Sequence, residues 1–469
     1  MTIQFGTDGW RAVIGEDYTY ENVRKVLQAF CDVKATSENR LILLGYDRRF
    51  SSKLFAEAAT EVLMGNGFTV LLSEDFCPTP CISWMTKHKR ALAGVVITAS
   101  HNPYQWNGVK FKEEDGGSAS PAYTAKIEAQ LMKNETSGKG IEKISLEEGK
   151  TRGLLIYFNP KREYVKALKK IINLPAIRRA KLKIVVDSMH GAGSGYFKAV
   201  LGDKVMEIRG EENPSFGGVN PEPIEKNLRL ARETVLKTRS SVLLATDGDA
   251  DRIGAIDDKG NYVTSHQIFS LILRHLVAVK KYKGSVIKTV STTEMIERLA
   301  LSYHFPVIET PIGFKHICEK FRHTNSIMGG EESGGIAFTH HVNERDGILS
   351  GLLLLEVIAH YKKPLSKIIA DLQKEVGPLH FFREDFHLTP EAIQEIRDRL
   401  SQNGDLDLPD FPLKRIGKQD GYKYYFKDGS WLLIRPSGTE PLLRIYAESS
   451  SPRKARTLIQ AGKKVAGLS

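Results

Sequence analysis

Short apolar runs separated by polar, amphipathic segments mark out the first part of the chain. The runs at 41–46, 68–72 and 93–97 are rich in Leu, Val and Ile and end abruptly in polar residues, which is typical of buried strands. Between the first two runs, apolar residues recur at helical spacing, which predicts a helix capped by Ser51 or Ser52 and ended by glycines. Strands that alternate with helices predict a largely parallel sheet with helices packed on it.

The same succession of strand, polar loop and helix recurs twice more along the chain. We expect a second unit with strands at 183–187 and 242–245 and a hairpin at 255–263. A third unit is expected to begin with a helix from Gln267 and a strand at 285–290. This recurrence predicts three units built on one plan.

The last hundred residues change character. Short strands are expected at 422–426, 430–434 and 442–447, followed by a helix that begins at Pro452, and a hinge is expected near 376–378. The predicted fold class is α/β, with three similar α/β domains that have mixed, mostly parallel sheets and a smaller C-terminal α+β domain, around a central cleft. The predicted domains are 1–150, 151–260, 261–375 and 376–469.

The composition indicates in which cellular compartment the protein is found. The 469 residues are 41% hydrophobic and 26% charged, and the longest apolar run, 351–355, is far shorter than the roughly 20 residues that span a bilayer. No signal peptide is recognisable, so we expect a cytoplasmic protein without membrane partners. Four cysteines are too few for a disulfide framework. Cys77 and Cys81 flank a Pro-Thr-Pro sequence, and no second Cys or His pair accompanies them as a metal site would need, so we expect a strand-to-helix turn there with Cys81 packed as a small apolar residue.

The formal net charge of +11 indicates either an anionic binding partner or an excess of basic residues on solvated surfaces. Many basic residues lie at 161–183 and 280–283, where they alternate with apolar residues at helical spacing, as on solvated helix faces. No recognisable nucleic-acid-reading module accompanies them, so we expect no nucleic-acid partner. A positive field also suits a small anionic substrate, which it would steer into a cleft.

A serine loop follows the strand at 93–97. That strand delivers Ser100 and His101 to the carboxyl edge of the predicted sheet, where open α/β sheets bind ligands. Pro103 and the Asn107-Gly108 pair force turns, so Ser100 is expected on a tight loop. No Gly-x-Ser-x-Gly sequence surrounds it, and a neighbouring His101 in extended backbone points away from it, so a hydrolase nucleophile is disfavoured.

Three carboxylates follow the strand at 242–245. Asp247, Asp249 and Asp251 alternate, so in extended backbone their side chains fall on one side, where they repel one another unless a hard cation is present. An EF-hand is excluded because Arg252 stands where that loop needs glycine and because the flanking segments are strands. We therefore predict a Mg²⁺ site, with a metal-free acidic turn as the alternative.

Two further segments carry groups that suit a sugar phosphate. Glu331 and Ser333 lie on a Gly-rich loop, and a carboxylate and a hydroxyl so spaced can bind paired sugar hydroxyls. Near the C-terminus, hydroxyls, a glycine-opened backbone and guanidinium groups predict a phosphate clamp on a domain that closes over the substrate. The clamp residues are Arg435, Ser437, Gly438, Thr439 and Arg444.

Four motifs occur in a fixed order: Thr98-Ala-Ser-His-Asn-Pro103, Asp247-Gly-Asp-Ala-Asp-Arg252, Gly330-Glu-Glu-Ser-Gly334 and Arg435-Pro-Ser-Gly-Thr-Glu-Pro441. With Gly6-Thr-Asp-Gly-Trp-Arg11 at the start, they resemble the α-D-phosphohexomutases, the family of phosphoglucomutase, phosphomannomutase and phosphoglucosamine mutase. The resemblance covers essentially the whole chain. One departure is Asp8, which stands where many family members have serine.

The resemblance assigns roles to individual residues. It implies that Ser100 is phosphorylated and that its phosphate oxygen joins Asp247, Asp249 and Asp251 as a metal ligand. Lys110 is implied in proton transfer and Arg252 at the transferring group, and Arg11 and His101 complete the catalytic candidates. The sugar contacts it implies are Glu331 and Ser333, at O3 and O4, with Gly313 and Lys315 as further substrate contacts.

The expected activity is transfer of phosphate between C6 and C1 of an aldohexose through a phosphoserine and a hexose 1,6-bisphosphate, which also serves as activator. Glucose is the first choice of sugar, because the sequences at 310–315 and 329–334 most resemble phosphoglucomutases. Mannose and glucosamine are the alternatives within the family. A metal-dependent sugar phosphatase and a non-catalytic sugar-phosphate binder are the alternatives outside it, and the protein is expected to be a monomer or a homodimer.

Overall fold

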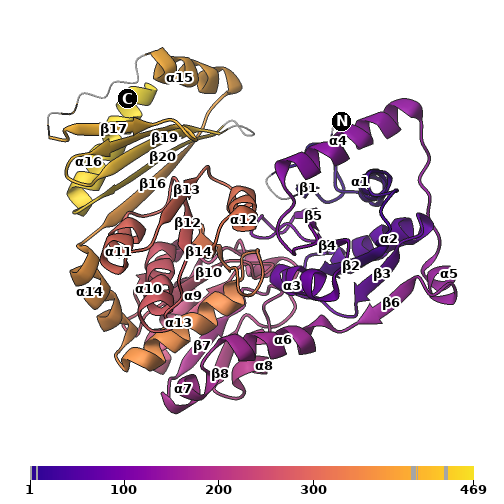
Figure 1. Cartoon of the computed structure of the whole chain (residues 1–469), viewed down its shortest axis with the longest axis horizontal. Coiled ribbons are helices and arrows are strands. Elements are labelled where there is room, and N and C mark those ends of the chain that lie inside the picture. Colours follow the sequence, from indigo (N-terminus) through magenta and orange to yellow (C-terminus); the bar gives the residue numbers. More distant parts are fainter. Residues whose placement is uncertain (1–2, 7–8, 403–407, 409, 438–441, 469) are drawn as a thin grey trace.

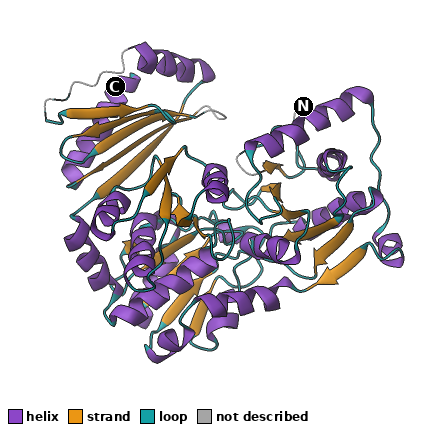
Figure 2. Ribbon diagram, viewed as in Figure 1, coloured by secondary structure: helices purple, strands orange, loops and turns teal. Residues whose placement is uncertain are grey.

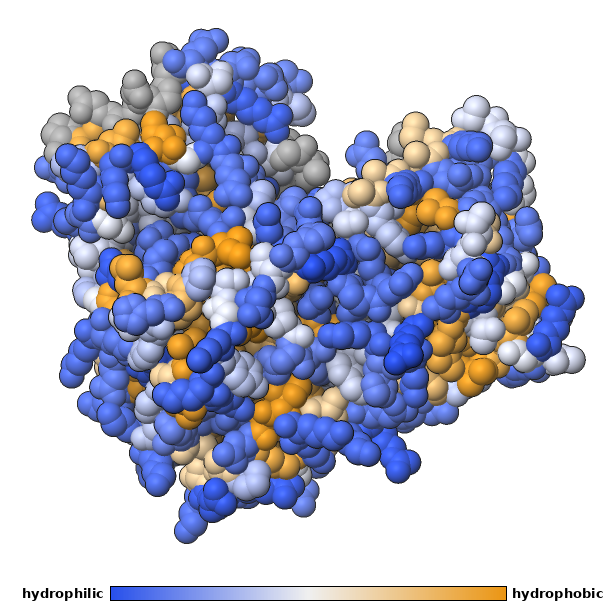
Figure 3. Space-filling model, in the orientation of Figure 1, coloured by the Kyte–Doolittle hydropathy of each residue, from blue (hydrophilic) through white to orange (hydrophobic). Residues whose placement is uncertain are grey.

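The computed structural model describes residues 3–6, 9–402, 408, 410–437 and 442–468. Four separate sheets follow one another along the chain, three with helices packed around them and a last one that is wholly antiparallel (Figures 1 and 2). The molecule is hollowed between the C-terminal unit at upper left and the N-terminal unit at upper right, and this hollow is largely hydrophilic (Figure 3). The predicted fold class is confirmed.

The first sheet has the strand order β1-β5-β4-β2-β3-β6. Strands β2, β3, β4 and β6 are parallel, whereas β5 runs antiparallel between β1 and β4. Its elements are β1 (Gly9–Val13), α1 (Tyr20–Val33), β2 (Leu41–Tyr46), α2 (Ser52–Gly65), β3 (Thr69–Ser73), α3 (Thr79–Lys89), β4 (Ala93–Ile97), β5 (Trp106–Lys112), α4 (Pro121–Ser137), α5 (Leu146–Thr151) and β6 (Leu155–Phe158).

Two details of the first unit differ from the sequence-based expectation. Neither serine caps α2 through its side chain: Ser51 makes no such bond, and the Ser52 hydroxyl donates to Asp47 Oδ1 at 2.7 Å instead. The expected boundary near residue 150 also precedes β6, which pairs with β3, so the first sheet takes its edge strand from beyond it.

The second and third units repeat part of this plan. The second sheet has the order β11-β10-β9-β7-β8 and the third β13-β12-β14-β15. The second unit consists of α6 (Pro160–Ile171), α7 (Leu174–Arg179), β7 (Ile184–Asp187), α8 (Tyr196–Leu201), β8 (Val205–Ile208), η1 (Phe216–Gly218), η2 (Glu225–Asn227), α9 (Arg229–Thr238), β9 (Val242–Thr246), β10 (Ile253–Ile256) and β11 (Tyr262–Val263). The third consists of α10 (Ser265–Ala278), β12 (Ser285–Thr289), α11 (Met295–Tyr303), β13 (Val307–Thr310), α12 (Phe314–His323), β14 (Ser326–Gly330), β15 (Ile336–Phe338), α13 (Gly347–Tyr361) and α14 (Leu365–Val376).

One strand arrangement is common to all three units. In each sheet a strand with a parallel neighbour on one side (β4, β9 or β14) is followed by a loop and then by an antiparallel strand on its other side (β5, β10 or β15). These three loops carry Ser100, the three aspartates and Glu331 respectively. The repeated plan therefore places one predicted functional segment of each unit at the carboxyl end of a strand.

The C-terminal unit is an antiparallel sheet of order β16-β20-β19-β18-β17. Its elements are β16 (His380–His387), α15 (Pro390–Gln402), β17 (Leu413–Gly417), β18 (Tyr422–Phe426), β19 (Trp431–Pro436), β20 (Leu442–Ser449) and α16 (Pro452–Ala466). The three predicted strands and the predicted helix are confirmed, and Ser451 accepts the capping bond at the start of α16.

Apolar packing joins the units unequally. Helix α13 is mostly apolar and almost wholly buried, and it belongs to one large core that includes residues of the first, second and third units. The C-terminal sheet has its own core against α15 and α16 and meets the third unit through a small cluster around Trp431 and Tyr446. All four cysteines are buried and free, and the burial of Cys81 is as expected. Of the described helices, none is long and apolar enough to cross a membrane.

Candidate active site

Ser100 sits in a strained loop that one arginine holds in place. Its backbone φ is 53°, a left-handed conformation that costs a non-glycine residue about 1–2 kcal/mol, and its side chain is buried. The wholly buried guanidinium of Arg49 donates to the Ser100 carbonyl at 2.6 Å and to the carbonyls of Asn102, Pro103 and Trp106. Arg49 therefore fixes the path of the loop that presents Ser100.

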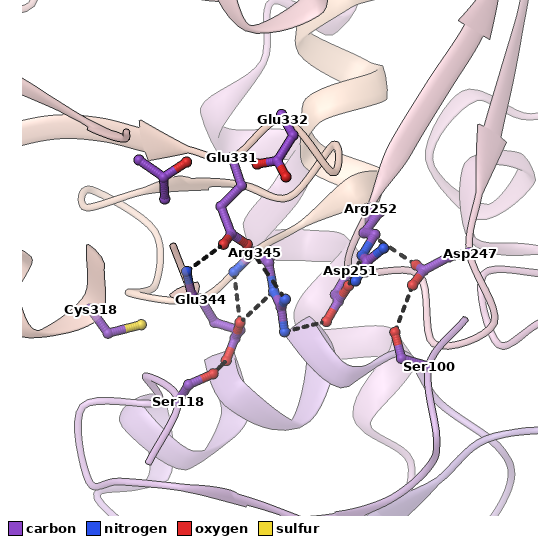
Figure 4. A network of polar contacts seen from close by, with 12 residues as sticks. Ser100, Ser118, Asp247, Asp251, Arg252, Cys318, Glu331, Glu332, Glu344 and Arg345 are labelled. Carbon is purple, nitrogen blue, oxygen red and sulfur yellow. Dashed lines mark hydrogen bonds and ion pairs between the residues drawn. The ribbon is translucent and has the colours of Figure 1, made fainter. Parts of the chain in front are cut away.

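The serine meets the acidic loop of the second unit. Ser100 Oγ donates to Asp247 Oδ2 at 2.8 Å, across 147 positions of sequence. The two loops approach so closely that a Cβ on Gly248 would lie 2.3 Å from the Ser100 carbonyl oxygen, which only glycine permits. The predicted association of the serine with the aspartates is thus a direct contact between the first and second units (Figure 4).

Asp247, Asp249 and Asp251 form a buried cluster that fits a hard cation. One carboxylate oxygen of each lies within 4.8 Å of the others. The Oδ1 atoms of Asp249 and Asp251 are buried without a hydrogen-bond partner in the described part of the chain, and an orphaned buried carboxylate oxygen costs free energy unless a cation or donor meets it. Oxygen donors alone are the set that Mg²⁺ prefers.

The aspartates are electrostatically unequal. Burial and the neighbouring charges of Asp251 and Asp249 raise the pKa of Asp247 well above its ordinary value. Burial acts in the same direction on Asp249, but Lys110 Nζ lies 2.8 Å from its Oδ2 and lowers the pKa of that carboxyl overall. Lys110 also donates to Asp251 at 3.1 Å, so its ammonium group is one internal counter-charge of the cluster.

The other catalytic candidates surround the serine loop. Arg11 donates to Asn102 Oδ1 at 2.8 Å, and the backbone N–H of Arg252 donates to Asp247 Oδ1 at 2.9 Å while its guanidinium pairs with Glu222 at 3.4 Å. Burial and the charges of Arg252, Arg11 and Lys110 lower the pKa of His101 well below its ordinary value, so this imidazole is neutral at pH 7. The structure brings these candidates together around Ser100, and their individual roles stay predictions.

The Gly-rich loop of the third unit carries a carboxyl group in an unusual state. Glu331 Oε1 accepts from the Gly313 backbone N–H at 3.2 Å, so two of the predicted substrate contacts adjoin each other. Burial raises the pKa of Glu331 to about 7, with Arg345 opposing the shift and Glu332 adding to it. Ser333 Oγ is buried without a hydrogen-bond partner among the described residues, and Lys315 is half-buried in the first turn of α12.

Arg345 is a site residue that the sequence did not reveal. Its guanidinium lies 2.8 Å from Asp251 Oδ2, 3.3 Å from Glu344 Oε1 and 3.8 Å from Glu331 Oε2 (Figure 4). Glu344 in turn pairs with Lys112 of β5 at 2.5 Å, with both side chains fully buried. Arg345 therefore links the acidic loop to the Gly-rich loop. The signal available in the sequence was the charged run 344–346, directly before a mostly apolar helix.

The predicted phosphate clamp lies on the C-terminal sheet. Arg435 and Arg444 are paired across β19 and β20, which places both on one face of the sheet. Arg435 Nε donates to Asp420 Oδ1 at 2.8 Å, and the Ser437 backbone N–H donates to the Leu442 carbonyl at 2.7 Å. Gly438 and Thr439 lie outside the described residues. The two arginines of the clamp thus share a face, and its binding of phosphate stays a prediction.

Comparison with known proteins places these features in a family. Family models for phosphoglucomutase/phosphomannomutase domains I, II, III and IV match residues 2–138, 162–260, 264–376 and 386–461. A phosphoglucomutase/phosphomannomutase of Thermococcus kodakarensis is 30% identical over 98% of this chain and 98% of its own. A probable phosphoglucosamine mutase of Pyrococcus furiosus is 32% identical over 99% of this chain and 97% of its own. The crystal structure of a putative phosphomannomutase from Thermus thermophilus has a TM-score of 0.86 at 32% identity, covering 100% of this chain and 99% of that chain.

Four matched domains and a serine held against a carboxylate cluster define an intramolecular phosphotransferase, an enzyme that moves a phosphoryl group within a sugar phosphate. The relatives are mutases whose names differ in the sugar. The chain belongs to the α-D-phosphohexomutase family.

Proposed function

We propose that the enzyme interconverts hexose 1-phosphate and hexose 6-phosphate, with glucose as the preferred sugar and Ser100 as the phosphate carrier. The observation that supports this most is the 2.8 Å contact between Ser100 Oγ and Asp247 inside a buried cluster of three carboxylates. A serine used only for structure has no need of such surroundings, whereas a phosphoserine beside three carboxylates requires a divalent cation between them, which would neutralise the charge of both.

Asp247, Asp249 and Asp251, with a phosphate oxygen on Ser100, would hold Mg²⁺, which would supply neutralisation of the charge on the transferring group. In the forward half-reaction the P–O bond to Ser100 breaks, a P–O bond to the free sugar hydroxyl forms, and the product is the hexose 1,6-bisphosphate. The sugar hydroxyl loses a proton and the serine oxygen gains one. We assign this proton transfer to Lys110, and the positioning of the phosphoryl group to Arg11, His101 and Arg252.

The second half-reaction requires the sugar to present its other phosphate. We assign Glu331 and Ser333 to paired ring hydroxyls, with Gly313 and Lys315 beside them. The phosphate that does not react would bind Arg435, Ser437 and Arg444, together with Gly438 and Thr439. Because this clamp recognises a phosphate and not a particular carbon, either end of the bisphosphate fits it, and Ser100 then takes back the phosphoryl group from the opposite end.

Glucose is proposed on the resemblance of segments 310–315 and 329–334 to phosphoglucomutases. Mannose and glucosamine are the alternatives, and the names of the relatives include both. The proposal includes a cytoplasmic enzyme that is a monomer or homodimer, acts on free sugar phosphates and has no nucleic-acid or membrane partner. The net charge of +11 would serve to steer these anions to the site.

The test is ³¹P NMR of the protein with Mg²⁺, a trace of glucose 1,6-bisphosphate and the 1-phosphates of glucose, mannose and glucosamine in competition. We expect 6-phosphate signals to grow at a constant total of phosphate esters, fastest for glucose, and expect Ser100→Ala to abolish them. Faster growth for mannose or glucosamine would contradict the choice of sugar. Growth of inorganic phosphate alone would indicate a phosphatase, and turnover that persists in Ser100→Ala would overturn the assignment of the carrier.

A further inference from the structure

Glu332, the central residue of the Gly-rich loop, points away from the proposed sugar contacts on either side of it. The carboxylate of Glu331 is directed at Arg345, whereas that of Glu332 lies away from it (Figure 4). Glu332 Oε2 accepts from Ser291 Oγ at 2.7 Å, and its carbonyl accepts from Ser265 Oγ at 2.5 Å. The loop that carries Glu331 and Ser333 is therefore anchored from behind through its middle residue.

The C-terminal unit contacts this anchor. Arg383 Nη1 on β16 lies 3.9 Å from Glu332 Oε1. Arg383 is itself oriented by a two-bond contact with Asp385, Nε to Oδ1 at 2.7 Å and Nη2 to Oδ2 at 2.6 Å. Two parallel hydrogen bonds to a carboxylate fix the orientation of a planar guanidinium group. The position of Arg383 close to Glu332 is therefore set by its neighbour Asp385 on the same strand.

The same charges continue to the phosphate clamp. Asp385 pairs in register with Arg444 across β16 and β20, and Arg444 Nε lies 3.7 Å from Asp385 Oδ2. Alternate residues of β16 face opposite sides of the sheet, and Phe382 packs in the core on the other side, against α16. Arg383 and Asp385 therefore share the face that carries Arg444, and opposite charges alternate along the path Glu332, Arg383, Asp385, Arg444.

A second link runs in parallel. Asp420 accepts from Arg435 Nε at 2.8 Å through one oxygen and from the Ile312 backbone N–H at 2.8 Å through the other. Ile312 precedes Gly313, whose N–H donates to Glu331. Each described arginine of the clamp is thus connected through one carboxylate-centred path to a segment proposed to bind the sugar ring.

We propose that Glu332 and Arg383 are positioning residues that set the sugar-hydroxyl loop relative to the phosphate clamp, so that recognition of the ring depends on where the C-terminal unit sits. This proposal rests on the proposed function of the same site. Neither residue contacts the reacting atoms. Their contribution is to hold Glu331 and Ser333 at the separation from Arg444 that one hexose phosphate spans, which affects substrate binding more than the chemical step.

The kinetic test compares Glu332→Gln, Arg383→Gln, Arg383→Lys and the double variant Glu332→Gln/Arg383→Gln with glucose 1-phosphate as substrate. Arg456→Gln is the matched control, because Arg456 is an exposed arginine of the same unit that packs over Phe382 on the opposite face. We expect each Gln variant to raise KM by up to about fivefold with kcat within about twofold, since partly exposed ion pairs contribute little each. Arg383→Lys should lie between wild type and Arg383→Gln.

The double variant decides whether the two residues act as one unit. Its KM should equal that of the more affected single variant, because replacing either side chain already removes the contact between Glu332 and Arg383. Multiplied effects in the double variant, or an equal rise of KM in Arg456→Gln, would overturn the proposal.

Hydrogen exchange of the peptides covering 330–336 supplies a readout that does not depend on the reaction. Exchange there should be faster in Arg383→Gln than in Arg456→Gln, while the peptide around Ser100 should be unchanged in both. Equal exchange of 330–336 in the two variants would refute the positioning role even if the wild type turned over no hexose phosphate, and that lack of turnover would separately contradict the proposed function.

Discussion

Replacement of Arg49 by lysine tests how the structure holds the loop of Ser100, the proposed phosphate carrier. The Arg49 side chain is fully buried and has five partners: the Asp47 carboxylate at 3.2 Å from Nε, and the carbonyls of Ser100, Asn102, Pro103 and Trp106 at 2.6, 2.7, 2.8 and 3.0 Å. Lysine keeps the positive charge that Asp47 needs. It loses the planar, branched set of donors that spans the loop.

The magnitude follows from counting donors. A lysine ammonium group has three N–H donors, so at least one of the four carbonyl acceptors loses its arginine donor. Each buried acceptor left without a donor costs about 1–3 kcal/mol, so at least about 1–3 kcal/mol is lost from the stability of the loop. The left-handed backbone of Ser100 adds to the tendency to open, because the residue relaxes to ordinary φ once the clamp is weakened.

The assay is native-state hydrogen exchange of peptides covering 98–107. A loss of about 1–3 kcal/mol accelerates exchange from the opened loop by about 5- to 140-fold. Arg48→Lys is the control, since Arg48 donates to the Gly210 carbonyl at 2.7 Å and packs over Phe76, outside the serine loop. Equal exchange in Arg49→Lys and wild type would show that the four carbonyl contacts do not hold the loop, and the reasoning would fail.

Three further predictions concern buried charge. Asp251→Asn should weaken Mg²⁺ binding by at least about tenfold in calorimetry, because one of three clustered carboxylates is neutralised; unchanged affinity would place the cation elsewhere. Lys112→Met leaves the buried Glu344 carboxylate without its main counter-charge, so the free energy of unfolding measured by urea denaturation should fall by about 3–5 kcal/mol. The double variant Lys112→Met/Glu344→Gln should recover part of this loss, because it removes the unpaired charge. Burial acts to raise the pKa of Glu344, but Lys112 and Arg345 lower this pKa overall. The contribution of the ionised Glu344 to the stability of the folded protein is therefore complete above the ordinary pKa of 4.5, and it is lost as the pH falls through the lower pKa of the folded state. Glu344→Gln should therefore flatten the acid side of the stability profile, and a curve parallel to wild type would contradict this sign.

The sequence was most informative where a residue's function coincides with a local pattern. Strand β4 and the turn at Pro103 place Ser100 at a sheet edge, and the spacing of the aspartates alone indicates a cation site. These inferences depend on periodicity and on turn chemistry within about ten residues. The same holds for the C-terminal strands, whose bounds agree with the structure to within two residues at each end.

Contacts between units could not be predicted in this way. Arg49 follows a strand in the manner of many surface arginines, and nothing near it in the sequence states that its guanidinium reaches four carbonyls more than fifty positions on. Ser51 and Ser52 show the converse failure, since the local rule for helix caps applied but the Asp47 carboxylate competed for the Ser52 hydroxyl. Local rules give the element, and tertiary partners decide what its polar groups bind.

The distribution of partners also bears on how the site can bind its ligands. Lys110 occupies the aspartate cluster, Arg345 lies between Asp251 and Glu331, and Arg435 is bound to Asp420. Under the proposed function, ligand binding at this site is an exchange in which a phosphate or a cation replaces an internal partner, and Lys110, Arg345 and the three aspartates are already buried before the ligand arrives. Such an exchange limits the affinity of the site for the substrate in its ground state. It also means that the polar groups of the site are already in place and need not reorient during the reaction, and fixed charges of this kind lower a reaction barrier most.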